Sequence, residues 1–436
     1  MRFYFLVSWR NIWRHKRRTL ITALAMAISL GLCMPLITLN DGFYLQFYDV
    51  LVKQRLGHVQ LRHPDYAKTK IMHDTMHNGT QLQQQIDTHP ATAVSTARLF
   101  GNALVSKEET ASGANITGVQ PTSEANLTRM DTAIETGRYL SETANLEIVI
   151  GTELARELEA SVEDILFVYT QAADGTPAYE LYTVVGVYSS GSVMMDRGMQ
   201  MHLTDLQNLL QLPEQLHEVI ALTDTKDRSV IGDYVEALPD HVNSGDKGYT
   251  FYRTAPEGFV SEQSSPPDNP VLIQSWWESS PQTSELMGFR DVATGLFLGI
   301  IFFIAGFGVL NTMLMSVFER TRELGLLKAV GLRPVKLIWL VLVEAGLLGV
   351  ISAIVGILIG ASLNWYLVNH GIDISGGSGE PMKMMGASFD PVVFGDVDIG
   401  YQIQPVLAMI VFSVVAAVWP AIRAARLEPV KSLRQD

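Results

Sequence analysis

A short charged run lies between two apolar stretches and is the first candidate for a functional site. From Phe318 to Pro334 the chain reads FERTRELGLLKAVGLRP. On a helix, Leu324, Leu327 and Val330 would share one side. Charged side chains outside that row would remain available to a partner protein; they are Arg320, Glu323 and Lys328. Such a short amphipathic helix could seat in a groove of another protein. No arrangement of nucleophile and base is evident in the chain, so we expect no catalytic residues.

Two other ionisable features invite a chemical interpretation. Glu344 lies several residues inside an apolar stretch, where a carboxylate is costly unless it has a partner or is neutral. We expect an interhelical hydrogen bond there, with a proton relay as the alternative. His73 and His77 are four residues apart and could share a metal ion on a helix, but no third ligand is evident, so we expect no metal site.

Four apolar stretches of about 20 residues surround these features, and each is long enough to cross a hydrocarbon core of about 30 Å. The chain of 436 residues is 47% hydrophobic, with a mean hydropathy of +0.17, which suits a protein partly in lipid and partly in water. The expected segments are an interfacial elbow helix (1–18), four transmembrane helices (19–40, 290–317, 335–363, 405–422), a large outer domain (41–289), a cytoplasmic helix (318–334), a second outer loop (364–404) that folds against the main domain, and a cytoplasmic tail (423–436).

Charge sets the orientation of these segments. The segment before the first span, the loop between the second and third, and the tail together hold 15 basic and four acidic residues, whereas residues 41–289 hold 15 basic and 34 acidic ones, a net charge of −19. Basic flanks stay in the cytoplasm, so we expect both termini inside and the acidic domain outside. The acidity argues against a nucleic-acid partner. The only cysteine, Cys33, lies in the first span, so the outer domain must be held by its core alone.

The outer domain is expected to mix helices and strands. Strands are indicated by runs of Val, Ile, Tyr and Leu, at 58–62, 97–105, 147–150, 165–169, 182–188 and 218–223. Helices are indicated at 153–160, 205–210 and 230–238, the second with Thr204 and Gln207 at capping-box spacing. The stretch 257–281, rich in Ser and Pro, is expected to be an extended connection. In the spans, small residues at four-residue spacing predict close helix packing; they include Gly295 and Gly299, and Ser352, Gly356 and Gly360.

The charged run from Phe318 to Pro334 resembles the cytoplasmic coupling segment of FtsX-type permeases of ABC transporters, whose pattern is close to E-R-x-x-E-I-G-x-L-K-A-x-G. Other segments resemble the periplasmic core and the C-terminal end of MacB-like permeases; they are Val149–Leu158, Tyr182–Tyr188, His202–Gln207 and Pro420–Val430. Two short segments, Asn40–Phe43 and Leu56–Gln60, resemble the lipoprotein-releasing LolC and LolE branch.

The resemblance implies a type VII ABC exporter working by mechanotransmission, with four transmembrane helices and a large α+β periplasmic domain, in the bacterial inner membrane. No Gly-x-x-x-x-Gly-Lys-Ser/Thr phosphate loop occurs in the chain, so ATP and Mg²⁺ would be used by a separate ATPase dimer and this permease would bind no cofactor itself. The residues implied in coupling to the ATPase are Glu319, Arg320, Arg322, Glu323, Gly325, Lys328, Ala329 and Gly331.

The LolC and LolE branch implies that the chain is not an enzyme but pairs with a second permease, itself or a paralogue, and extracts lipoproteins from the outer leaflet toward a periplasmic carrier. Large apolar residues of the first two spans are expected to line the cavity for the acyl chains; they are Met26, Leu30, Met34, Phe303 and Phe307. Two alternatives stay open. One is MacB-like tripartite efflux of peptides or drugs, and the other is FtsX-like regulation of a cell-wall hydrolase.

Overall fold

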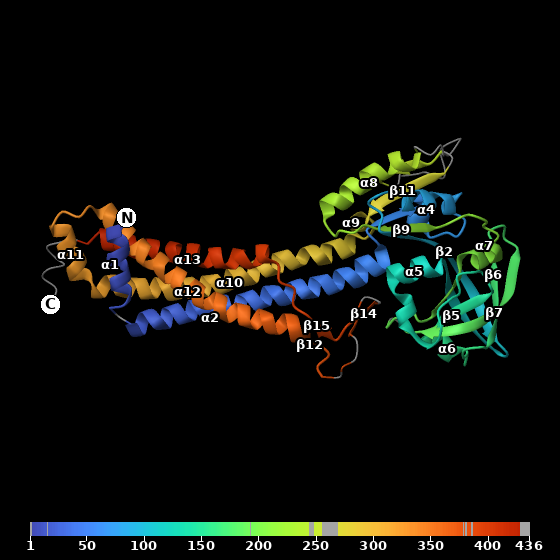
Figure 1. Cartoon of the computed structure of the whole chain (residues 1–436), viewed down its shortest axis with the longest axis horizontal. Coiled ribbons are helices and arrows are strands. Elements are labelled where there is room, and N and C mark those ends of the chain that lie inside the picture. Colours follow the sequence, from blue (N-terminus) through green and yellow to red (C-terminus); the bar gives the residue numbers. More distant parts are fainter. Residues whose placement is uncertain are drawn as a thin grey trace. The chain divides into compact units, whose positions relative to one another are not determined.

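The computed structural model describes residues 2–14, 16–191, 193–243, 248–254, 269–377, 379, 382–384 and 387–427. The chain divides into two compact units (Figure 1). The first unit comprises residues 1–45, 287–377 and 392–436 and holds the apolar helices, and the second comprises residues 46–286 and 378–391 and holds the large sheet.

Within the described residues, four helices are long and apolar enough to cross a membrane, which confirms the predicted number of spans. They are α2 (Lys16–Phe47), α10 (Pro281–Glu319), α12 (Pro334–His370) and α13 (Ile399–Ala425). Each of these helices is longer than its apolar stretch because less apolar turns extend it at one or both ends.

Shorter elements complete the first unit. They are α1 (Arg2–Ile12), α11 (Thr321–Ala329), and the paired strands β12 (Ile372–Asp373) and β15 (Val392–Val393). Helix α1 packs on α12, where the hydroxyl of Ser8 donates to the carbonyl of Leu340 at 3.2 Å. That α1 lies in the membrane interface as an elbow stays a prediction.

Glycines allow α2 and α12 to approach closely. A Cβ atom at Gly356 would lie 2.9 Å from the side chain of Leu30, and one at Gly360 would lie 2.6 Å from the sulfur of Met34. These contacts confirm the expected role of small residues in helix packing for this pair of helices. A Cβ at Gly295 or Gly299 would meet no other atom within 4 Å, so that pair supports no packing within this chain.

The second unit is built on a sheet of 11 strands among the described residues. Their bounds are β1 (Val59–Arg62), β2 (Val94–Lys107), β3 (Thr110–Val119), β4 (Ile134–Gly137), β5 (Glu147–Gly151), β6 (Ile165–Gln171), β7 (Pro177–Tyr188), β8 (Gly198–His202), β9 (Glu218–Leu222), β10 (Thr250–Tyr252) and β11 (Pro270–Ser275). All six strands predicted from the sequence are among them.

Six of these strands form a closed ring, in which each strand pairs with two neighbours. Neighbours pair in the order β2, β3, β8, β5, β7 and β6, and β6 pairs with β2 again. Strands β9, β1, β11 and β10 continue the sheet from β2, and β4 extends it from β7. The long β2 therefore belongs to both parts of the sheet, which share one hydrophobic core.

Helices and helical turns cover this sheet and connect its strands. They are η1 (Tyr48–Leu56), α3 (Pro64–Thr69), α4 (Gly79–Asp87), α5 (Pro121–Thr128), η2 (Met130–Ala133), α6 (Thr152–Glu157), α7 (Leu203–Leu210), α8 (Arg228–Asn243) and α9 (Trp276–Ser279). The three predicted helices correspond to α6, α7 and α8.

Two local predictions for this unit are wrong. The N-cap of α7 is His202, whose Nδ1 accepts from the backbone N–H of Thr204 at 3.2 Å, so Thr204 and Gln207 form no capping box. The stretch 257–281 is not wholly an extended connection, because its part at Pro270–Ser275 is strand β11, which pairs with β1. Residues 257–268 of that stretch lie outside the described residues.

The second outer loop contributes to the second unit. Residues 378–391 cluster with that unit and include the paired strands β13 (Met382–Met384) and β14 (Ala387–Phe389). The ring of Phe389 packs against that of Phe47 in a tilted arrangement, with centroids 4.6 Å apart. The expectation that the loop folds against the main domain is thus confirmed for residues 378–391, whereas residues 364–377 and 392–404 belong to the first unit.

Candidate functional site

The charged run identified in the sequence forms helix α11, a separate element between α10 and α12. Gly331 has a φ of 99°, a left-handed conformation that favours glycine and commonly ends a helix. The chain turns there, and Pro334 begins α12 at a first-turn position, where the missing N–H of proline costs nothing. Glycine and proline therefore keep α11 distinct from the long helix that follows.

A buried ion pair joins the start of α11 to the interior of α12. The Nη1 atom of Arg320 lies 3.2 Å from Oε2 of Glu344, and both side chains are about nine-tenths buried. An isolated charge in this position would lose its hydration without compensation. The opposite charge of each residue therefore offsets the free-energy cost of burying the other. The expectation of an interhelical contact at Glu344 is confirmed, and its partner is Arg320.

A second ion pair joins α11 to the N-terminal segment. Glu323 forms a salt bridge with Arg14, which follows α1, and its Oε2 atom lies 3.3 Å from Nε of Arg320. The two guanidinium groups together lower the pKa of the Glu323 carboxyl, against the opposing effect of its partial burial. Glu323 thus remains ionised and bridges two cations, one of which is the partner of Glu344.

The far end of α11 is held by α13. The ammonium group of Lys328 donates to the carbonyls of Ala425 and Leu427, at 2.8 Å each. These are carbonyls at the C-terminal end of a helix, where a cation is favoured. The side chain of Leu324 is buried between these contacts, in a hydrophobic cluster with Leu337 and Ala421.

The face of α11 that points away from the helices differs from the one expected. Leu324 is buried, but Leu327 and Val330 are exposed, and Val330 is 81% exposed. Leu326 is exposed with them, next to Arg322. The expectation that Arg320 is available to a partner is wrong because the side chain is turned inward to Glu344.

The other predicted coupling residues divide between the two faces. Gly325 is buried, and the exposed ones are Glu319, Arg322, Ala329 and Gly331. The sequence interpretation missed Arg14 and Leu326. No spacing signals Arg14, which is 309 residues from Glu323. A signal existed for Leu326, because Arg322, Leu326 and Val330 follow the four-residue spacing of one helix face.

Two protein-family models match long segments of this chain. Residues 19–238 match the family model of the MacB-like periplasmic core domain, and residues 295–429 match that of the FtsX-like permease C-terminal region. The first match covers half of the chain, and the second contains α11 together with α12 and α13, two of the helices that hold it. This chain belongs to the FtsX/MacB family of ABC transporter permeases.

Individual relatives are similar to this chain at low identity. The permease is 22% identical to the lipoprotein-releasing system transmembrane protein LolC of Xylella fastidiosa, over 99% of this chain and 98% of that protein. It is 31% identical to the macrolide export ATP-binding/permease protein MacB of Nitrosomonas europaea, over 34% of this chain and 20% of that protein. The solved periplasmic region of MacB from Actinobacillus actinomycetemcomitans aligns with 52% of this chain and 92% of its own, at 10% identity and a TM-score of 0.36. The permease is an inner-membrane protein with a periplasmic-type domain.

The residues expected to line an acyl-chain cavity in this permease are not brought together. Met26, Leu30 and Met34 are buried in the helix interior, where Gly356 and Gly360 of α12 make room for the last two. Phe303 and Phe307 are exposed on α10, with ring centroids 4.8 Å apart. The choice of Met26, Leu30 and Met34 is therefore wrong for a cavity that opens outside the chain. The exposed apolar row of α2 is instead Leu24, Ile28, Leu32 and Leu36.

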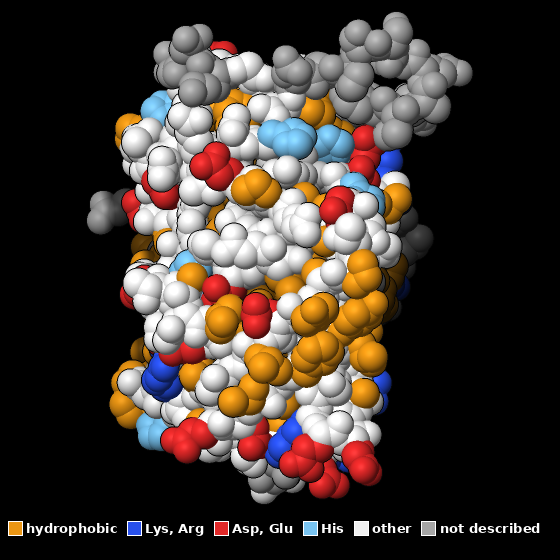
Figure 2. Space-filling view, turned by 90° about the vertical axis from the view of Figure 1, so that its right-hand side faces the viewer, with side chains coloured by type: hydrophobic (Ala, Val, Ile, Leu, Met, Phe, Trp, Pro, Cys, Tyr) orange, Lys and Arg blue, Asp and Glu red, His pale blue; other side chains and the backbone are white. Residues whose placement is uncertain are grey.

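The outer domain carries an exposed apolar face on β2, β6 and β7. Side chains of β6 alternate strictly between exposed and buried, and three of the four exposed ones, Ile165, Phe167 and Tyr169, are large and apolar. Figure 2 shows such side chains gathered on this face of the domain. Neighbouring strands supply the other members, with Phe167 opposite Leu181 and Tyr169 between Leu104 and Tyr179. We call this set the hairpin face; it comprises Leu104, Ile165, Phe167, Tyr169, Tyr179 and Leu181.

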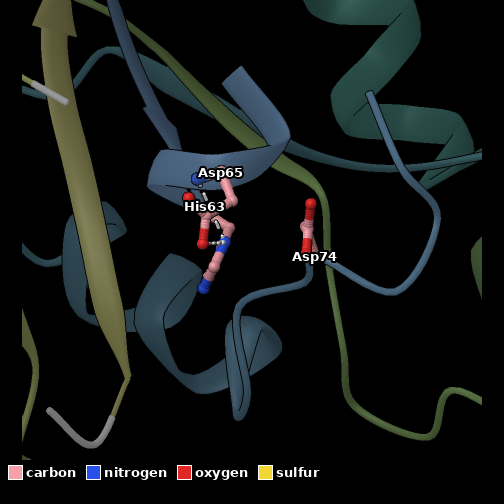
Figure 3. A group of neighbouring side chains, drawn as sticks. All are labelled: His63, Asp65 and Asp74. Atoms are coloured by element: carbon pink, nitrogen blue, oxygen red, sulfur yellow. Dashed lines mark hydrogen bonds and ion pairs between the residues drawn. The ribbon is translucent and has the colours of Figure 1, made fainter. Parts of the chain in front are cut away.

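One group of side chains has the composition of a metal site. Possible ligand atoms of His63, Asp65 and Asp74 lie within 4.8 Å of one another (Figure 3). Their contacts are those of a local turn, because the His63 ring accepts from the backbone N–H of Asp65 at 3.3 Å and Asp74 accepts from the hydroxyl of Thr69 at 2.8 Å. These hydrogen bonds explain the cluster as a cap for α3. The residues weighed from the sequence, His73 and His77, are not part of it.

Proposed function

We propose that this chain is the permease subunit of an ABC transporter that extracts lipoproteins from the outer leaflet of the inner membrane, using ATP hydrolysed by a separate ATPase dimer. The observation that carries this proposal is the likeness to the lipoprotein-releasing protein LolC, which spans 99% of this chain and 98% of that relative. In this arrangement both termini and α11 face the cytoplasm and the sheet-containing unit is periplasmic. The charge asymmetry between these segments supports that orientation.

Helix α11 is the element that the ATPase would move. Its exposed face offers Leu326, Leu327 and Val330 as an apolar contact, with Arg322 beside them. A groove with apolar walls and an acidic rim on the ATPase would fit this face. Because α11 is tied to α1, α12 and α13 by the contacts of Glu323, Arg320 and Lys328, a displacement of α11 must displace those helices or break these contacts.

The acyl chains of the cargo need an apolar surface outside the packed helix interior. The exposed rows of α2 and α10 supply one, including Leu32 on α2 and Phe303 on α10. A second permease, either another copy or a paralogue, would close these rows into a cavity. Each methylene group sheltered there saves about 0.8 kcal/mol of exposure to water, so the cavity lowers the cost of lifting the chains from the bilayer.

The hairpin face would receive the periplasmic carrier that takes the lipoprotein away. Six large apolar side chains on one exposed sheet face are unusual in a periplasmic domain unless a partner covers them at some stage. A carrier that itself shelters acyl chains must have apolar surface near its opening, which suits this face.

Macrolide efflux is the second candidate function, because the identity to the MacB protein of Nitrosomonas europaea reaches 31% over 150 residues. Regulation of a cell-wall hydrolase, the third possibility raised from the sequence, gains no support from a specific observation.

The decisive experiment is reconstitution of the permease and its ATPase, purified together, into liposomes carrying an acylated model protein. We expect ATP-dependent release of the acylated protein and none of the same protein retained by a membrane-spanning helix. If ATP instead drives movement of a macrolide or an unacylated peptide and leaves the acylated protein in place, efflux replaces lipoprotein release.

A further inference from the structure

A large cleft in the second unit is lined by none of the residues of the hairpin face. Its volume is about 730 Å³, within the range of about 300 to 1,000 Å³ that small ligand sites occupy. Strands β1, β2, β3, β8 and β9 supply its floor, and η1, α5 and η2 supply its walls. All of these elements belong to the second unit.

The floor of the cleft is a fixed row of alternating charges. Arg62 pairs with Glu218, with 2.6 Å between its Nε atom and the nearer carboxylate oxygen. Glu218 also lies 3.7 Å from Arg98. Arg98 in turn makes two hydrogen bonds to Glu124, of 2.7 and 3.0 Å. Arg98, Glu124 and Glu218 are more than nine-tenths buried, so the row is held in one arrangement.

Arginine is concentrated at this cleft. Residues 41–289 contain nine arginines and carry a net charge of −19, yet four of those nine line this one cleft. Two of the four, Arg62 and Arg98, belong to the charged row, while Arg55 on η1 and the exposed Arg129 after α5 lie on the walls. Glu124, Glu218 and Asp390 are the acidic residues of the lining, so the cleft carries a small positive excess within an acidic domain.

This lining fits a polypeptide rather than an acyl chain. A hydrocarbon laid in the cleft would cover the exposed guanidinium group of Arg129 without giving it an acceptor, which is unfavourable. An extended polypeptide offers a carbonyl acceptor and an N–H donor at each residue, and its carbonyl and carboxylate groups can accept hydrogen bonds from the guanidinium groups on the cleft walls. Apolar side chains such as Leu56, Phe100 and Met130 also line the cleft and provide contacts for side chains of the bound segment.

We infer that this cleft holds the polypeptide segment of the cargo that adjoins its lipid anchor, with acidic residues favoured in that segment. The inference rests on the proposed function. Its choice of occupant is supported by chain continuity, because η1 follows α2 directly and supplies Val50, Arg55 and Leu56 to the cleft wall. A lipoprotein held by its acyl chains would present its first residues beside the end of such a helix, and a positive cleft would retain them.

Photo-crosslinking in the intact transporter tests this inference. Benzoylphenylalanine at Phe100, which lines the cleft without joining the charged row, should crosslink to an acylated model protein with acidic residues after its anchor. The same probe at Val230, exposed on α8, should not. Benzoylphenylalanine at Phe303 on α10 reports the acyl-chain contact of the proposed function.

The charge of the cleft is tested by Arg129→Glu, with Lys226→Glu as the matched change at an exposed lysine outside the cleft lining. We expect Arg129→Glu to lower the crosslink at Phe100 by about fivefold, the scale of one exposed ion pair, and Lys226→Glu to leave it unchanged. An equal crosslink in both variants overturns the charge preference, and a crosslink at Phe303 without one at Phe100 overturns the site. Absence of a crosslink at both positions overturns the proposed function as well.

Discussion

Replacing Glu344 with glutamine removes the negative charge from the buried pair while keeping the shape of the side chain. Arg320 then remains about nine-tenths buried with one ionic contact, the Oε2 atom of Glu323 at 3.3 Å from its Nε. Removing one partner of a buried pair costs about 3 to 5 kcal/mol. Because the introduced amide can still accept a hydrogen bond and Glu323 still offers its charge, we expect the lower end, about 3 kcal/mol.

This free energy is lost from the packing of α11 on α12, so it shifts the equilibrium between α11 packed on α12 (seated) and α11 released from it (unseated). A loss of about 3 kcal/mol changes the ratio of seated to unseated α11 by roughly 150-fold. The exposed face at Leu326 and Val330 is untouched, so the ATPase should still bind. We therefore expect Glu344→Gln to hydrolyse ATP at a rate near that of the unaltered protein while releasing much less cargo per ATP.

The assay is the ratio of lipoprotein released to phosphate produced in liposomes containing the permease and its ATPase. Glu285→Gln is the matched control, because it makes the same chemical change at an exposed position of α10, outside the residues implied in coupling. The double variant Arg320→Gln, Glu344→Gln should be no worse than Glu344→Gln alone, since the two residues act as a pair. An unaltered release ratio in Glu344→Gln, or additive losses in the double variant, would refute the reasoning.

Three further predictions concern topology, pH and the acyl-chain surface. In a cysteine-free background, cysteine at Ser161 should react with an impermeant thiol reagent in intact cells and cysteine at Leu326 should not. Burial lowers the pKa of His58 and of His217 to about 4. The stability of the outer domain should therefore be full above the unfolded pKa of 6.5 and fall by up to about 3 kcal/mol per histidine as the pH drops from 6.5 to 4, as measured by chemical unfolding of the full chain. Phe303→Asp should abolish lipoprotein release while ATP hydrolysis continues, because the charge would meet acyl chains.

Each of these predictions has a contrary result. Labelling at position 326 in intact cells would overturn the four-span topology. A glutamine at position 217 preserves a donor and an acceptor without titrating, so it should flatten part of the pH dependence; the same loss of stability in His217→Gln would assign it to other groups. Normal lipoprotein release by Phe303→Asp would exclude that face of α10 from the acyl-chain path. Substitution of Met34 is a poorer test, because its side chain packs against Gly360 and its loss disturbs the helix interior.

The sequence by itself determined the elements whose signals are local. An apolar stretch of bilayer length indicates a span whatever it packs against. A run rich in Val, Ile, Tyr and Leu, as in β6, indicates a strand, although it does not show which face of the strand is covered. The charged run from Phe318 to Pro334, which lies between two apolar stretches, likewise indicated a short helix distinct from the span that follows. Even the need of Glu344 for a partner followed from its place in an apolar stretch.

Only the tertiary structure decided which residues meet and which face of an element is left uncovered. Helical spacing predicts that Leu324, Leu327 and Val330 share one side of a helix. Helix α11 is nevertheless apolar on more than one side, and of these three residues only Leu324 is covered by the packing of α12 and α13. The partner of Glu344 depends on how α11 crosses α12, and the arginines of the cleft come from strands and helices far apart in the chain. Such contacts depend on three-dimensional crossing geometry, which no periodicity along the sequence contains.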